Sequence, residues 1–307
     1  MDIGSFFNYH QQKDILDCCI LSDLIYQKDK YIESLYNLSK MKISKSDKKK
    51  LLNKSEGVQK DFFITLNNLV KNPLLYRLSL PIKSKSVDIH FGFFMFKDKL
   101  ILSYQGTYDW NEVIADLDIK QVKINDEFPD ILVHEGFLNG FKTSQPVVKE
   151  YINEYINKYP NNKIYITGHS LGAAISTLAM VFLKEKFRSD NIHCVTFGCP
   201  KIGNKDFVEY FNKKINNNIQ FINNEDIVPT LPPFPSYSLL KPIYVIKKGK
   251  ITKDDSSKRY TNMFIDFFWS IFNYTKSPIT MHHCDNYLKD LKESYLDLFI
   301  SLNEDDE

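Results

Sequence analysis

The stretch KIYITGHSLGAA, residues Lys163 to Ala174, places Ser170 between two glycines where β-branched and aromatic residues give way to helix formers. This pattern is typical of a nucleophile elbow, a sharp strand-to-helix turn that lifts a serine Oγ clear of the backbone. Gly168 and Gly172 flank the serine because so tight a turn leaves no room for a Cβ where strand and helix nearly touch. A bare GxSxG pattern also arises by chance, so its surroundings decide its meaning.

Strands and helices alternate on both sides of the elbow. Strands are predicted at 164–167, 192–197 and 219–223, and helices at 136–158 and 171–186. Two earlier strands lie within 87–107 and are joined by a turn at 97–99. A hairpin at 241–253 turns at Gly249. This alternation predicts an α/β fold with a mixed, mostly parallel central sheet flanked by helices. The polar residues that follow the strands predict a site at the strand carboxyl ends.

Length and composition favour one domain. A chain of 307 residues with 43% hydrophobic residues can bury a large core. Within a single domain spanning 1–307 we expect a helical region at 1–80, a core at 87–288, and a C-terminal helix and acidic tail at 289–307. Apolar residues recur at helical spacing from 13 to 39 and again from Asp285 onward, which supports the two flanking helical regions.

The charge balance and the cysteines limit the possible partners and compartment. A formal net charge of +2 gives no electrostatic case for nucleic acid as the main partner. The lysine-rich stretch Lys40–Lys60 is either a solvated segment or a patch for anionic membranes. Five cysteines without CxxC spacing favour a reducing compartment. The first residues do not resemble a signal peptide and no apolar run of about 18 residues predicts a membrane span, so we expect a cytoplasmic protein.

An elbow serine needs a base to take its proton and an acid to orient that base. In elbow hydrolases the acid and then the histidine follow the serine in the chain. Asp226 directly follows the predicted strand 219–223, and the prolines of the IVPTLPP segment stiffen its loop. His193 begins a strand predicted to be buried, which leaves His282 and His283 as candidate bases. Their alternative role is that of a helix cap or surface group.

The residues HHCD at 282–285 are also metal-ligand types. Contiguous residues cannot all turn to one ion, and no second ligand pair is evident, so we expect no metal site. No cofactor is expected either.

Negative charge that develops on a substrate carbonyl oxygen requires donors already in place. The backbone amide of Leu171, directly after the nucleophile, supplies one. The QGT segment at 105–107 ends an earlier predicted strand, where Gly106 brings the backbone close and Thr107 offers a hydroxyl and an amide. An ordinary turn is the alternative for this segment.

Six ordered motifs extend the pattern beyond the elbow. In chain order they are SYQGTYDWNEVIADLD, VHEGFLNGF, GHSLGAA, TFGCPKIGN, NNEDIVPTLPP and HHCDNYL. From about Val87 to Leu288 the chain resembles the class 3 lipase family, the fungal-type triacylglycerol lipases with an α/β-hydrolase fold. The resemblance implies serine esterase chemistry on acyl glycerols.

The resemblance also assigns roles to individual residues. It maps the nucleophile to Ser170, the acid to Asp226, and the oxyanion donors to Thr107 and Leu171. Family members often carry the base five residues before a Tyr-Leu pair, which selects His282, with His283 as the alternative. Two positions depart from the family: many relatives have arginine where Gln105 stands, which puts the rigidity of the oxyanion loop in question, and a serine is common where Cys199 stands, a change of packing.

Two apolar segments bear on lipid binding. Tyr108–Ala115 corresponds to the lid of relatives, and its alternative is a fixed surface helix. Tyr260–Tyr274 is rich in aromatic residues over most of its helical circumference, so it either lines an acyl pocket, docks on a lipid surface, or is a core helix.

These observations together predict a serine acyl hydrolase that cleaves lipid esters, in the first place a triacylglycerol lipase. Its partners would be a lipid ester substrate and, transiently, a lipid surface. The alternatives are a phospholipase A1, a small-ester or feruloyl-type esterase, or a non-catalytic lipid-binding protein on a hydrolase scaffold.

Overall fold

The computed structural model describes residues 6–41, 58–82, 85–107, 119–233, 235–241, 243–254 and 282–295. The helices in these ranges are α1 (Tyr9–Leu24), α2 (Asp29–Lys40), α4 (Val58–Asn67), α6 (Glu135–Lys158), α7 (Leu171–Phe187), α8 (Lys205–Lys214), the short 3-10 helix Val228–Thr230 and α10 (Cys284–Ser294). The strands are β1 (Leu74–Ile82), β2 (Lys85–Met95), β3 (Lys99–Tyr104), β4 (Gln121–Lys123), β5 (Leu132–His134), β6 (Lys163–His169), β7 (Ile192–Phe197), β8 (Asn218–Asn223), β9 (Ile243–Lys247) and β10 (Lys250–Asp254).

Eight of these strands form one sheet in the order β1-β2-β3-β6-β7-β8-β9-β10. Strands β3, β6, β7, β8 and β9 run parallel, whereas β1 and β2 at one edge and β10 at the other pair antiparallel. Strands β4 and β5 pair separately. The predicted fold class, a mostly parallel central sheet flanked by helices, is confirmed.

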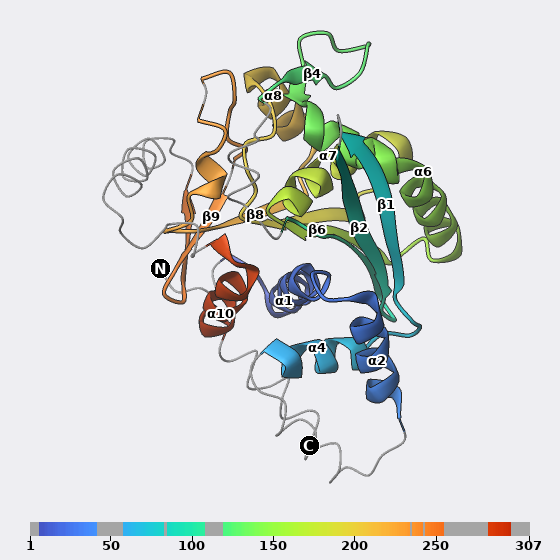
Figure 1. Ribbon diagram of the computed structural model, residues 1–307. Coiled ribbons are helices and arrows are strands. Elements are labelled where there is room, and N and C mark those ends of the chain that lie inside the picture. Colours follow the sequence, from blue (N-terminus) through green and yellow to red (C-terminus); the bar gives the residue numbers. More distant parts are fainter. Residues whose placement is uncertain are drawn as a thin grey trace.

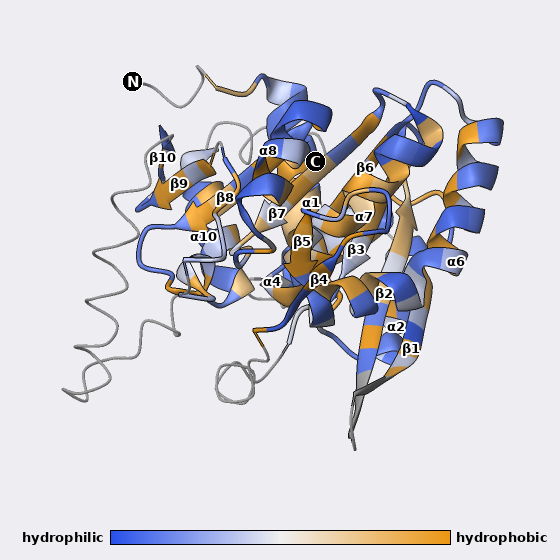
Figure 2. Cartoon of the chain, turned by 90° about the horizontal axis from the view of Figure 1, so that it is seen from above, coloured by the Kyte–Doolittle hydropathy of each residue, from blue (hydrophilic) through white to orange (hydrophobic). Residues whose placement is uncertain are grey.

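Helices cover both faces of the sheet (Figure 1). Side chains of α6, α7 and α8 pack with one face in a large apolar cluster, and α1, α4 and α10 pack with the other face in a second cluster. Hydrophobic and hydrophilic residues are mixed along β6 and β8, and α6 carries hydrophilic bands (Figure 2). None of the described helices is both long and apolar enough to cross a membrane.

The predicted elements around the elbow are confirmed to within a few residues, and the hairpin turns at Gly249 between β9 and β10. The helical region expected at 1–80 contains α1, α2 and α4, but it also contains a strand that was not predicted, since Leu74–Ile82 forms the edge strand β1. Tyr76, Leu78 and Leu80 alternate along this strand and pack against the core, which is a period of two rather than a helical period.

Four predicted features concern segments outside the described residues. They are the lid at Tyr108–Ala115, the aromatic segment Tyr260–Tyr274, most of the lysine-rich stretch Lys40–Lys60, and the chain after Tyr295.

Polar contacts fix α1 to the sheet at two levels. Near its start, the buried Lys99 ammonium contacts Asp14 and lies 2.6 Å from Oδ2 of Asp17. Near its end, Ser22 Oγ lies 3.0 Å from Thr167 Oγ1, three residues before the elbow serine. The C-terminal end of α1 is therefore held beneath the carboxyl end of β6.

Candidate active site

The elbow has the strained geometry that the sequence predicts. Ser170 joins β6 to α7 with φ 66° and ψ −126°, a region that residues with a Cβ rarely occupy. A Cβ added to Gly168 would lie 2.4 Å from the carbonyl carbon of Gly172, and one added to Gly172 would lie 2.2 Å from the carbonyl oxygen of Tyr104. Both glycines are therefore required by close backbone approach.

Three predicted residues meet at this turn. Ser170 Oγ lies 2.6 Å from Nε2 of His282, and Nδ1 of His282 lies 2.7 Å from Oδ2 of Asp226. Their exposed fractions are 0%, 2% and 0%. A buried serine, imidazole and carboxylate in this chain of hydrogen bonds can transfer the serine proton to the imidazole while the carboxylate stabilises the cation that forms.

The two adjacent histidines have different surroundings. His282 is buried against Ser170, whereas His283 is exposed and occupies the N-cap position of α10 without a side-chain hydrogen bond to that helix. The structure thus brings His282 to the serine and leaves His283 in solvent.

Asp226 is held by two further donors. Its Oδ1 accepts a hydrogen bond of 2.9 Å from the backbone amide of Val228, and its Oδ2 accepts one of 2.5 Å from the hydroxyl of Tyr287. Tyr287 is itself fixed, because its oxygen accepts a hydrogen bond of 2.9 Å from the backbone amide of Asn223. Burial, followed by the nearby Asp226 carboxylate, raises the pKa of Tyr287 well above its usual range, so the phenol remains a donor. The sequence marked Tyr287 only by its distance from the base.

The turn after β7 makes room for the acid and the base. Gly198 has φ 59°, and a Cβ there would lie 2.9 Å from both Oδ2 of Asp226 and Cε1 of His282. The next residue, Cys199, is fully buried, and burial raises the pKa of its thiol to about 12. The neutral thiol therefore packs as a small side chain, in agreement with a packing change at this position.

The loop at 105–107 lies against the elbow. A Cβ on Gly106 would lie 2.6 Å from the carbonyl oxygen of His169 and 3.1 Å from Cβ of Ser170. Thr107 follows this contact directly, and Leu171 is the first residue of α7, where backbone amides have no partner within the helix. The two predicted oxyanion donors therefore come from segments that both border Ser170.

Gln105 is anchored even though it is not an arginine. Its side-chain oxygen accepts a hydrogen bond from Nδ1 of His90, and its backbone amide donates to the carbonyl oxygen of His90 over 2.9 Å. Nε2 of His90 lies 3.0 Å from Oδ1 of Asp29, which also binds Arg77. A side chain on β2 thus holds the start of the oxyanion loop.

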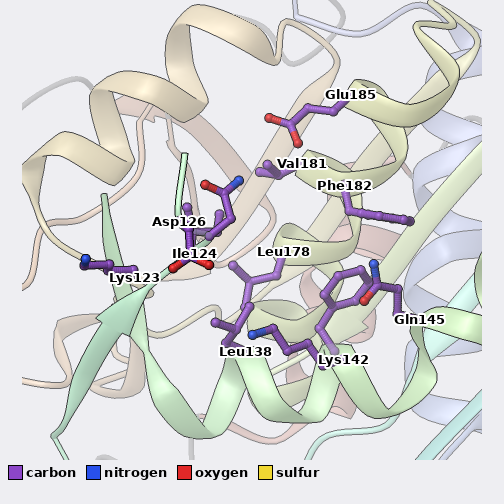
Figure 3. Close-up of a pocket in the computed structure, with 12 residues that line it drawn as sticks. Lys123, Ile124, Asp126, Leu138, Lys142, Gln145, Leu178, Val181, Phe182 and Glu185 are labelled. Atoms are coloured by element: carbon purple, nitrogen blue, oxygen red, sulfur yellow. The ribbon is translucent and has the colours of Figure 1, made fainter. Parts of the chain in front are cut away.

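A separate pocket of about 500 Å³ lies between β4, α6 and α7 (Figure 3). Its lining combines apolar side chains such as Leu178 and Phe182 with charged ones such as Lys142 and Glu185. Its lining residues include none of Ser170, His282 and Asp226. It is therefore a different site from the one described above.

Comparison with known proteins places this geometry in context. The model of the family described as lipase (class 3) matches residues 101–236. A secreted mono- and diacylglycerol lipase of Fusarium solani is 28% identical over 160 residues, which cover 52% of this chain and 47% of the relative. A secreted mono- and diacylglycerol lipase of Malassezia globosa is 34% identical over 103 residues, which cover 33% of each chain. The chain thus spans about half or less of the length of these relatives.

The fold likeness extends further than the sequence likeness. The solved structure of the triacylglyceride lipase of Rhizomucor miehei superposes with a TM-score of 0.63 at 18% identity, over 91% of this chain and 98% of that one. This likeness supports the α/β-hydrolase fold.

The relatives overturn one expectation. The chain was expected to be cytoplasmic, but the Fusarium solani and Malassezia globosa relatives are both named as secreted. The expectation relied on unpaired cysteines and on the first residues of the chain. Buried thiols such as Cys199 pack as small apolar groups in any compartment, so they are weak evidence for a reducing one.

Proposed function

The chain belongs to the class 3 lipase family through its residues 101–236, and on this premise we propose that it hydrolyses lipid esters through an acyl-enzyme. The observation that carries the proposal is the pair of hydrogen bonds from Ser170 Oγ to His282 Nε2, at 2.6 Å, and from His282 Nδ1 to Asp226 Oδ2, at 2.7 Å. Nucleophile, base and orienting acid are in contact before any substrate binds.

In the first half of the reaction, Ser170 Oγ attacks the ester carbonyl carbon while its proton passes to Nε2 of His282. Asp226 keeps Nδ1 protonated and stabilises the imidazolium. The backbone amides of Thr107 and Leu171 donate to the oxygen that becomes negative, and each such donor is worth about 3 to 4 kcal/mol of barrier. The intermediate then collapses, and His282 protonates the departing alkoxide.

In the second half, water replaces the alcohol. His282 takes a proton from the water as it attacks the acyl-enzyme carbonyl, and returns that proton to Ser170 Oγ as the acid leaves. One ester and one water are consumed, and one alcohol and one carboxylic acid are produced. The enzyme ends in its starting state.

We assign acylglycerols as the substrate class. The names of the two secreted relatives support partial acylglycerols alongside triacylglycerol. Transient contact with a lipid surface is part of this proposal, and the aromatic composition of the segment 260–274 supports it. Replacement of Trp269 and Phe268 by serine should lower activity on emulsions and spare short soluble esters, and unchanged activity on both would contradict the surface contact.

The secreted relatives also support a site of action outside the cell. Immunodetection of the protein in the medium and in the cells of its own source organism tests this assignment. Retention of the full-length protein in the cytosol would contradict it.

The proposed activity is tested by hydrolysis of nitrophenyl esters of graded chain length and of mono-, di- and triacylglycerol emulsions. Wild type should release acid from acylglycerols, and Ser170→Ala should not. Greater activity on phospholipid than on any acylglycerol would replace the substrate class by that of a phospholipase. Absence of Ser170-dependent turnover on every ester would favour a lipid-binding protein on this scaffold.

A further inference from the structure

His169 precedes the elbow serine and takes no part in the reaction proposed above, yet it is fully engaged. Its Nε2 lies 2.5 Å from the backbone carbonyl oxygen of His282, and its Nδ1 lies 2.9 Å from the hydroxyl of Tyr26. The rings of His169 and His282 are 4.4 Å apart between centroids. A continuous chain of contacts therefore runs from Tyr26 to the main chain of the base.

The chemistry of the partners fixes the direction of each hydrogen bond. A carbonyl oxygen only accepts, so His169 carries a proton on Nε2 and donates it to His282. Burial, followed by the nearness of the His282 imidazole, holds the pKa of His169 well below its usual range, so the ring is neutral and its Nδ1 bears a lone pair. The hydroxyl of Tyr26 must then donate to that lone pair.

The position of Tyr26 is set by α1. Its backbone amide donates to the carbonyl oxygen of Asp23, over 3.1 Å, at the end of that helix. The Ser22–Thr167 contact just before it, at 3.0 Å, holds this end of α1 beneath β6. A Cβ on Gly106 would lie 2.1 Å from the Tyr26 hydroxyl, so the phenol also packs against the oxyanion loop. Tyr26 thus lies between the oxyanion loop and His169, the residue that contacts the main chain of the base His282.

The other tautomer of His169 would break this arrangement. With the proton on Nδ1, the Nε2 lone pair would face the carbonyl oxygen of His282 at 2.5 Å, and two acceptors would repel each other. The carbonyl oxygen of His282 selects the Nε2-protonated tautomer, because it can only accept. The Tyr26 hydroxyl then donates to the Nδ1 lone pair that this tautomer leaves. Without it, a buried acceptor would be left unpaired.

We propose that Tyr26 is a positioning residue. Its hydroxyl donates to Nδ1 of His169 and fixes that ring, and the ring in turn, through its Nε2–H, holds the main chain of His282 where its imidazole meets Ser170. This inference rests on the proposed hydrolysis. It assigns the N-terminal helix α1 a role in the alignment of the base.

A double-mutant cycle tests whether Tyr26 acts on His282 through His169. Tyr26→Phe removes only the hydroxyl and should lower kcat on a soluble nitrophenyl ester by about tenfold, with KM changed by less than about twofold. His169→Gln places a side-chain amide that donates to the carbonyl whatever its neighbour, so Tyr26→Phe in that background should lower kcat by less than about twofold. Tyr155→Phe is the control and should leave kcat unchanged. It removes a buried hydroxyl on α6 that accepts a hydrogen bond from the side chain of Asn162.

A spectroscopic measurement separates this inference from the proposed function. Nitrogen-15 NMR of histidine-labelled Ser170→Ala protein should show His169 as the Nε2-protonated tautomer. Addition of Tyr26→Phe should move the Nδ1 resonance of His169 downfield, because its lone pair loses a hydrogen-bond donor. Lack of hydrolysis by wild type would refute the proposed function and leave this measurement valid. An Nδ1-protonated His169, unchanged spectra in Tyr26→Phe, or an equal loss of kcat from Tyr26→Phe in both backgrounds would overturn the positioning role.

Discussion

The Oγ atom of Ser170 lies 2.6 Å from Nε2 of His282, although 112 positions separate the two residues in the chain. The parallel strands explain how such distant residues meet. Ser170 follows β6, and Asp226 follows β8, two strands away across β7, so both project from the same carboxyl edge of the sheet. His282 lies at this edge just before α10, and its imidazole is hydrogen-bonded to Asp226 there.

Replacement of each adjacent histidine by alanine should separate the buried residue from the exposed one. His282→Ala removes the proton acceptor of Ser170 and should lower kcat by at least about 10⁴-fold. His283→Ala changes an exposed side chain and should alter kcat by less than about twofold. Initial rates on one soluble ester measure both, and a large loss in His283→Ala alone would reverse the assignment of the base.

Tyr287→Phe should lower activity and stability together. The substitution removes the donor to Asp226 Oδ2 and leaves the backbone amide of Asn223 without its partner, at a cost of about 1 to 3 kcal/mol in the free energy of unfolding. The poorer support of the acid should lower kcat by about tenfold. Urea unfolding and ester hydrolysis measure the two effects.

Tyr295→Phe is the matched control for that variant. Tyr295 is equally buried, but its hydroxyl has no hydrogen-bond partner among the described residues. Its loss should leave kcat unchanged and stability equal or higher. Equal effects of the two substitutions would show that Tyr287 acts only through packing.

Gly198→Ala should abolish most activity through a direct clash. The new methyl would lie 2.9 Å from both Oδ2 of Asp226 and Cε1 of His282, in addition to the cost of φ 59° for a residue with a Cβ. Gly249→Ala provides the control, since Gly249 has a similar φ of 68° in the β9–β10 turn. Both variants should lose about 1 kcal/mol or more of stability, but only Gly198→Ala should lose activity. A comparable loss of activity in both would attribute the effect to backbone strain.

Asp23→Asn should stabilise the protein in a pH-dependent way. Burial, with further repulsion from Asp285 and Asp61, raises the pKa of Asp23 from 3.8 to about 7. As pH rises from about 4 to 7, the unfolded state loses this proton first, so the group lowers the free energy of unfolding over that window.

Asparagine at position 23 cannot ionise, so this fall in the free energy of unfolding with rising pH should not occur in the variant. Asp23→Asn should gain roughly 2 kcal/mol relative to wild type at about pH 8 and little at about pH 4, as measured by urea unfolding. Asp98→Asn removes an exposed carboxylate from a turn and is the matched control for the change of side chain. A gain that is the same at both pH values would contradict the role of ionisation.

The sequence around the elbow was sufficient to predict β6, α7 and the acid after β8, because each depends on local features: a short apolar run, a glycine turn, and a carboxylate at a strand end. The edge strand β1 was not predicted although Tyr76, Leu78 and Leu80 alternate, since the helical spacing at 13–39 set the expectation for the whole region 1–80. Pairing with β2, which stabilises β1, is not visible within the segment itself.

The residues that hold the catalytic residues in place could not be predicted from the sequence either, because they too depend on contacts between distant parts of the chain. The contact of Tyr26 with His169 joins residues 143 positions apart, and neither periodicity nor spacing predicts such a pairing. The choice between His282 and His283 likewise depends on which imidazole α10 directs inward. The anchoring of Gln105 by His90 requires the register of β2 with β3, which places these residues next to each other.

The most direct test of the central claim is covalent capture of the nucleophile by an alkylphosphonate p-nitrophenyl ester, followed by peptide mass spectrometry. The proposed mechanism predicts one phosphonyl group per chain, on Ser170, with none bound in Ser170→Ala and much slower labelling in His282→Ala. Labelling of another residue, or labelling of Ser170 at the same rate with and without His282, would contradict it.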